Sequence, residues 1–146
     1  MPFPDITLLN RDLQGKRLPG AKFVITPRDC AVIAELSRWP DIEPSPIFGF
    51  VAALRSLGVT LDEMCRLCDF ELAAGPMLGE CTLRIEKSLQ LDRPYRTEVL
   101  IHGIERKQSA LRGTIDVLRF SVALCCSSAG RVAEVDLTWL LPRGSA

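Results

Sequence analysis

The segment from Ser45 to Gly58 constrains the fold more than any other part of this sequence. Ten of the eleven residues from Ile47 to Leu57 are uncharged, and the exception, Arg55, lies near the C-terminal end, where a cation interacts favourably with the helix dipole. The segment begins with Ser-Pro, a pair typical of a helix start, and closes on a glycine, which is typical of the position past a helix end. Because such a helix has no polar face and is too short to cross a membrane, we expect other elements to bury most of its surface.

The second half of the chain changes from helical to strand-like periodicity. The segments that we interpret as strands are 79–90, 95–105, 114–126 and 131–141. Turn signals separate them at 91–94, 106–109 and 127–130. Short connections favour antiparallel neighbours, and the last three segments are long enough to twist around a helix. The sequence therefore predicts an α+β fold in which a long antiparallel meander of about five strands wraps the central apolar helix.

The first half of the chain supplies shorter elements. Three prolines favour an irregular path over residues 1–20, and residues 21–25 are typical of a short strand. Thr26-Pro27-Arg28-Asp29 is a capping box, which predicts a helix running to about residue 39. Thr60-Leu61-Asp62-Glu63 is a second one, which predicts a short helix to about residue 68 and a linker at 73–76.

Composition excludes several classes of function. Lysine plus arginine and aspartate plus glutamate each number 18, so no net charge attracts nucleic acid or an anionic membrane. No secretory signal is recognised, so we expect a cytoplasmic protein whose six cysteines are reduced thiols. Cys65 and Cys68 form a C-x-x-C pair without a second pair, and His102 is the only histidine. We therefore expect no metal site, and we interpret His102 as a surface or hydrogen-bonded residue.

The order of elements resembles the hotdog fold, and several motifs resemble the MaoC-like (R)-hydratase/dehydratase family. The matching runs are Asp12-Leu13-Gln14-Gly15-Lys16, Val24-Ile25-Thr26-Pro27-Arg28-Asp29, Leu89-Gln90-Leu91-Asp92-Arg93-Pro94-Tyr95-Arg96, Ile104-Glu105-Arg106-Lys107-Gln108 and Gly130-Arg131-Val132-Ala133-Glu134-Val135. The resemblance implies a single hotdog domain over residues 1–146. It also implies an acyl-thioester ligand, carried by coenzyme A or by the phosphopantetheine arm of an acyl-carrier protein, and no resident cofactor.

The catalytic motif of that family, roughly Gly-Asp-x-Asn-Pro-x-His, falls on residues 40–46 of this chain. Asp41 and Pro44 match the family's aspartate and proline, whereas Glu43 replaces the asparagine and Pro46 replaces the histidine. Hydration requires one group that activates water and another that moves the second proton, and a proline side chain does neither. The motif is therefore degenerate, and Asp41 and Glu43 are the candidate catalytic residues if the chain is active as a hydro-lyase.

The same resemblance places the acyl chain along the central helix. The residues that we expect to bind the thioester are Ile47, Phe48, Phe50 and Val51 for the acyl chain and Arg93 and Arg106 for the phosphates. We interpret Gly49 as permitting close packing of a strand or of an acyl chain. An open sheet edge favours a homodimer, or a heterodimer with a catalytic hotdog subunit.

Three hypotheses for the function follow from the sequence. The preferred one is a non-catalytic or degenerate subunit of a 3-hydroxyacyl-thioester dehydratase or enoyl hydratase. The second is an active hydratase, dehydratase or thioesterase that uses Asp41 or Glu43. The third is a scaffold that binds no acyl ligand.

Overall fold

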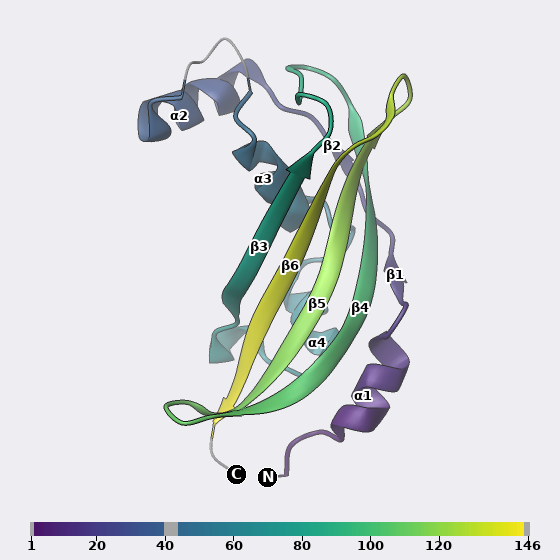
Figure 1. The fold of residues 1–146 in the computed structure, drawn as a ribbon, viewed down its shortest axis with the longest axis vertical. Helices are drawn as coiled ribbons and strands as arrows, with labels where there is room; N and C mark the ends of the chain where they lie inside the picture. Colours follow the sequence, from purple (N-terminus) through teal and green to yellow (C-terminus); the bar gives the residue numbers. More distant parts are fainter. Residues whose placement is uncertain (1, 40–43, 145–146) are drawn as a thin grey trace.

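A long antiparallel sheet dominates the computed structural model, which describes residues 2–39 and 44–144 (Figure 1). Its strands follow the order β1-β4-β5-β6-β3, and β2 also pairs with β4. The strands are β1 (Arg17–Leu18), β2 (Lys22–Phe23), β3 (Met77–Ile85), β4 (Tyr95–Ser109), β5 (Gly113–Cys126) and β6 (Gly130–Gly144). The helices are α1 (Ile6–Leu13), α2 (Pro27–Ser37), α3 (Ile47–Arg55) and α4 (Leu61–Leu67), with a 3-10 turn, η1, at Leu72–Ala74. All pairings are antiparallel, which confirms the predicted α+β class.

The predicted meander is wrong in one respect, because β3 pairs with β6 and not with its successor β4. The connection between β3 and β4 crosses the end of the sheet, and Lys87 Nζ donates to the carbonyl oxygen of Ala129 in the β5–β6 turn, at 3.1 Å. This contact lies between segments 42 residues apart. β3 thus forms one edge of the sheet, and β6 separates it from β5.

The N-terminal region, predicted to be irregular, contains the helix α1. Asp5 caps it, and the Oδ1 atom of this carboxylate accepts hydrogen bonds from the backbone N–H groups of Thr7 at 2.8 Å and Leu8 at 3.2 Å. The prolines that argued against a helix at Pro2 and Pro4 precede the cap and so interrupt no helical hydrogen bond. The prediction was wrong because an aspartate cap right after the prolines starts a helix that the prolines do not prevent.

The predicted turn at 106–109 is also wrong, because these residues extend β4. Arg106 lies opposite Asp116, and Gln108 lies opposite Thr114 in the β4–β5 register. The Arg106 guanidinium donates to Asp116 at 2.7 Å and 3.0 Å, and Gln108 Nε2 donates to Thr114 Oγ1 at 3.0 Å. Cross-strand pairs of this kind stabilise a sheet, so the polar residues lengthen the hairpin instead of ending it.

The helix α3 lies against the sheet with Gly49 at its closest approach. A Cβ atom on Gly49 would lie 3.2 Å from Leu83 Cδ2 and 3.6 Å from Val135 Cγ2, so the missing side chain lets β3 and β6 contact the helix backbone. This agrees with the interpretation of Gly49 as a close-packing residue. The expectation that most of α3 is buried holds for the face that carries Ala52 and Ala53, which are fully buried, but Ile47 is 39% exposed.

The two ends of α3 differ in how well they match the prediction. The Ser45 hydroxyl accepts a hydrogen bond from the Ile47 backbone N–H at 3.3 Å, although Pro46 itself occupies the cap position. Gly58 has a φ of +79°, and a Cβ atom there would lie 2.5 Å from the backbone of Gly20. This glycine both tolerates the left-handed conformation and lets the two loops touch.

The predicted capping box of α2 is present, with the Thr26 hydroxyl and the Asp29 carboxylate each accepting from the other's backbone N–H. The predicted short helix is α4, and the Thr60 hydroxyl accepts from the Glu63 backbone N–H at 3.0 Å.

Figure 1 shows α2 projecting past the β3 side of the sheet. Within the described ranges, no helix has the length and apolar character needed to cross a bilayer.

Candidate functional site

A groove between α2 and α3 forms the first candidate site. It encloses a cavity of about 200 Å³. Its apolar lining comes from Val32 and Ile33 of α2 and from Phe48 and Val51 of α3. Charged side chains also line it, namely Arg28 and Asp29 at the start of α2 and Arg55 at the end of α3. The groove thus combines an apolar wall with a charged rim, a combination typical of sites for amphipathic ligands.

The acidic group at the rim is held as a carboxylate. The backbone N–H of Thr26 donates to Asp29 Oδ2 at 2.9 Å and lowers the pKa of Asp29, and the Thr26 hydroxyl, Arg55 and Arg28 act in the same direction against the effect of burial. A carboxylate with a lowered pKa is a weak base, so Asp29 suits a structural role better than proton transfer. The two arginines give the rim a net positive charge.

The structure brings together some of the residues predicted to bind an acyl chain. Phe48 and Val51 line the α2–α3 groove, whereas Ile47 and Phe50 lie on α3 without lining it. The two candidate catalytic residues, Asp41 and Glu43, lie outside the described residues, so their predicted role stays a prediction.

The two predicted phosphate-binding arginines do not line this groove. Arg106 is engaged by the carboxylate of Asp116, and its guanidinium carbon lies 5.5 Å from the centre of the Phe3 ring. Arg93 lies in the β3–β4 connection, where its positive charge contributes to lowering the pKa of the Cys126 thiol. Both assignments to a thioester stay predictions.

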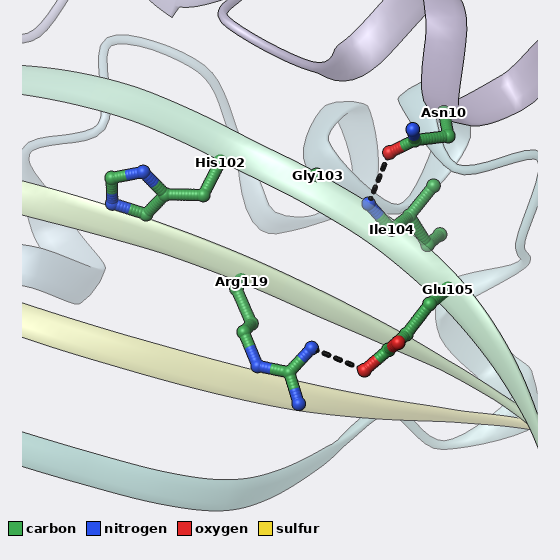
Figure 2. A pocket seen from close by; sticks show the side chains of 6 residues that line it. All are labelled: Asn10, His102, Gly103, Ile104, Glu105 and Arg119. Carbon is green, nitrogen blue, oxygen red and sulfur yellow. Dashed lines mark hydrogen bonds and ion pairs between the residues drawn. The ribbon is translucent and has the colours of Figure 1, made fainter.

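A second cavity, of about 270 Å³, lies beside His102, between α1 and the strands β4 and β5 (Figure 2). Figure 2 shows the residues that surround it: Asn10 of α1, Gly103 and Ile104 of β4, and the ion pair between Glu105 and Arg119. The Asn10 Oδ1 atom accepts from the Ile104 backbone N–H at 2.9 Å, next to an irregularity in the β4–β5 register. This hydrogen bond joins α1 to the sheet.

His102 belongs to a polar network that sequence reasoning did not find. Its Nε2 atom lies 2.5 Å from Ser121 Oγ, and the Ser121 hydroxyl donates to Asp136 Oδ1 at 2.6 Å. Burial acts to raise the pKa of Asp136, but the hydrogen bonds from Ser121 and Arg84, together with nearby positive charge, outweigh it and lower the pKa. The single proton of the hydroxyl forms the hydrogen bond to this carboxylate, so in the contact with Ser121 the imidazole N–H must be the donor and the Ser121 oxygen the acceptor.

This arrangement does not activate Ser121 as a nucleophile. In a catalytic serine the imidazole accepts the hydroxyl proton, whereas here the imidazole donates and the acceptor is a weakly basic carboxylate. The network is a hydrogen-bonded row across β4, β5 and β6, and it agrees with the interpretation of His102 as a hydrogen-bonded residue. The sequence carried no signal for this network, because only the register of β5 and β6 places Ser121 opposite Asp136.

The cysteines are free thiols with structural surroundings. Cys65 and Cys68 are both fully buried, and burial raises the pKa of Cys68 to about 12. Throughout the residues described, no three histidine, cysteine or acidic side chains gather as metal ligands would.

No protein-family model matches the sequence, and no curated protein matches it. Solved structures match its fold along most of its length. A HadBC (3R-hydroxyacyl-ACP dehydratase) complex from Mycobacterium tuberculosis has a TM-score of 0.68 at 13% identity, over 88% of this chain and 97% of that one. The ChsH1–ChsH2 complex from the same organism has a TM-score of 0.65 at 14% identity, over 97% of this chain and 90% of that one.

A MaoC-like dehydratase from Rhodospirillum rubrum matches with a TM-score of 0.60 at 11% identity, over 91% of this chain and 94% of that one. Structural matches at identities this low demonstrate a common fold and leave the chemistry open. The chain therefore has the hotdog fold of MaoC-like dehydratases, as the sequence predicted.

Proposed function

We propose that this chain is an acyl-thioester-binding subunit of a hotdog dehydratase or hydratase assembly, in which a second hotdog chain supplies the catalytic imidazole. The observation that carries the proposal is the α2–α3 groove, with its apolar wall and its two rim arginines. Apolar side chains suit an acyl chain, and guanidinium groups suit a carrier that bears phosphates.

The lack of an available imidazole favours a binding role over a catalytic one. His102 is the only histidine of the sequence, and it is engaged with Ser121 on the outer side of the sheet. Besides the cavity in Figure 2, His102 lines one further cavity, together with Arg17 and Glu98, and no residue of α2 or α3 lines it. His102 therefore does not reach the α2–α3 groove through either cavity. A hydration step at the groove would therefore need a proton-transfer group from elsewhere.

Exposed apolar side chains support a protein partner at this end of the molecule. Val32 is 47% exposed and Leu36 is 78% exposed, both on α2, and β3 leaves one edge of the sheet unpaired. Unpaired strand edges and apolar helix faces are covered in stable assemblies. Two of the matching structures are complexes of two different chains, and we infer a hotdog partner for this chain as well.

Binding is tested by titrating saturated acyl-CoA thioesters of short, medium and long chain into the purified protein. We expect tighter binding with longer chains, and weaker binding in Val32→Gln, which makes the groove wall polar at an already exposed position. Leu111→Gln is the matched control, because Leu111 is 95% exposed at the β4–β5 turn. Failure of every acyl thioester to bind would favour the scaffold hypothesis.

Catalysis is tested by assaying hydration of enoyl thioesters with the isolated chain and with candidate hotdog partners. We expect activity only with a partner that carries an intact Asp-His motif. Hydration or thioester cleavage by the isolated chain, lost in Asp41→Asn or Glu43→Gln, would establish the active-enzyme alternative instead.

We also propose a cytoplasmic location, where reducing conditions keep six free thiols stable.

A further inference from the structure

A third cavity, of about 470 Å³, lies where β2, β4 and the β5–β6 hairpin meet. Its lining includes Lys22 of β2, Tyr95 and Arg96 of β4, and Cys125, Cys126 and Ser127 of the hairpin. Burial alternates along β4, with Tyr95 and Thr97 buried and Arg96 exposed between them, so Arg96 points away from the core that α3 covers. The cavity is therefore distinct from the α2–α3 groove.

Two cations face each other across this cavity. Lys22 of β2 lies directly opposite Arg96 of β4 in the antiparallel register, and both side chains are exposed. Like charges at directly opposed positions destabilise a sheet. Among the ion pairs of the described chain, none includes Lys22 or Arg96.

Other cations on the same face of the sheet are neutralised by acidic neighbours. Arg84 contacts Asp136 at 2.6 Å, Arg119 contacts Glu105 at 2.5 Å and Arg131 contacts Glu134 at 2.7 Å. The acid nearest in sequence on β4, Glu98, lines a separate cavity of about 210 Å³ and not this one. Lys22 and Arg96 thus differ from these cations in forming no ion pair among the described residues.

The β5–β6 hairpin contributes Cys125, Cys126 and Ser127 to the lining of the cavity. The hydroxyl of Ser128 lies 3.7 Å from Cys126 Sγ. This hydroxyl lowers the pKa of the Cys126 thiol, and the backbone N–H groups of Ala129 and Ser128 and the charge of Arg93 act in the same direction. The charge of Arg93 therefore reaches a residue of the lining and adds to the charges of Lys22 and Arg96 at this end of the sheet, which favours an anion there.

We propose that this cavity binds the phosphate or diphosphate group of a small molecule between Lys22 and Arg96. A guanidinium donates to two phosphate oxygens at once, and a lysine ammonium adds a point charge from the opposite strand. The bound anion relieves the repulsion between the two cations. The proposal is independent of the α2–α3 groove, since it concerns the opposite face of the sheet.

The test is calorimetric titration of inorganic pyrophosphate into the full chain. We expect saturable one-site binding that weakens about tenfold or more in both Lys22→Gln and Arg96→Gln, since each removes a charge-assisted contact. Arg112→Gln is the control, because Arg112 is an exposed cation in the β4–β5 turn, at the opposite end of β4 and β5 from the cavity. Without ligand, Arg96→Gln should melt no lower than the unaltered protein, because it removes a repulsion.

Two results would overturn the proposal: no saturable binding, or an equal loss of affinity in Arg112→Gln, which would indicate only diffuse surface charge. Competition then identifies the source of the phosphate. Displacement of pyrophosphate by coenzyme A but not by adenosine diphosphate supports a thioester carrier as the ligand, and displacement by both supports a nucleotide site. Displacement by sulfate as readily as by either compound shows an unselective anion site and contradicts the proposal.

Discussion

Asp116→Asn should destabilise the protein more than any other polar substitution in the sheet. Asp116 is fully buried in β5 and interacts with two arginines, Arg106 at 2.7 Å and Arg143 at 2.9 Å. Arg143 in turn donates to the carbonyl oxygens of Cys68, at 2.6 Å, and Asp69, so the carboxylate also anchors the end of α4. The side chains of both arginines are themselves largely buried.

The magnitude follows from the charges that the substitution leaves behind. Asparagine has nearly the same size as aspartate, so no cavity forms, but its neutral amide leaves two buried guanidinium groups without a counter-charge. Removing one partner of a buried ion pair costs about 3–5 kcal/mol. For a chain of this size that corresponds to a decrease in Tm of roughly 10 °C.

The assay is thermal and urea unfolding of the altered and unaltered proteins, followed by circular dichroism. Arg119→Gln is the matched control, because it breaks an equally short ion pair whose partners are half exposed, and exposed pairs contribute little. We expect no measurable change in the control. If Asp116→Asn costs less than about 1 kcal/mol, the buried carboxylate does not hold these elements together and the reasoning is refuted.

Three further predictions concern the loops, a cap and a buried thiol. Gly58→Ala should lower stability by more than Gly75→Ala, because both glycines have positive φ angles but only at Gly58 does a Cβ atom meet backbone; chemical denaturation of the two variants compares them. Asp29→Ala should lower stability near neutral pH and have no effect in acid, as unfolding curves at several pH values will measure. The pKa of Asp29 is lower in the folded protein than in the unfolded chain, so the carboxylate stabilises the fold above the unfolded pKa. This contribution is lost as the pH falls through the folded pKa. Cys68 should resist thiol reagents at neutral pH until the protein unfolds, as peptide mapping after labelling will establish, because its pKa is raised to about 12 by burial.

The parts of the fold that depend on local sequence could be predicted from it. The Thr26 capping box, the apolar α3 and the alternation along β5 each gave an element close to its observed place. The pairing of β3 with β6 could not be predicted, because strand order depends on contacts between residues far apart, such as that between Leu83 and Val135. Short connections favour neighbours in a sheet but do not require them.

The candidate site could be predicted only where it follows the helix. The resemblance pointed to the apolar residues of α3, of which Phe48 and Val51 line the groove and Ile47 and Phe50 do not, and their role in binding stays a prediction. Val32 was missed because its place depends on how α2 packs beside α3, which periodicity alone does not give. Arg106 was predicted to lie in a turn and to bind a phosphate, because its partner, Asp116, comes ten positions later and only the strand register brings the two together.

The most direct test of the central claim is photocrosslinking with an acyl-CoA that carries a photoreactive group at the end of its acyl chain. We predict that the label maps by mass spectrometry to peptides of α2 and α3, at Val32, Phe48 or Val51, and that unlabelled acyl-CoA suppresses it. Labelling confined to other elements, or labelling that an excess of unlabelled thioester leaves unchanged, would contradict the assignment of the α2–α3 groove as the acyl-binding site.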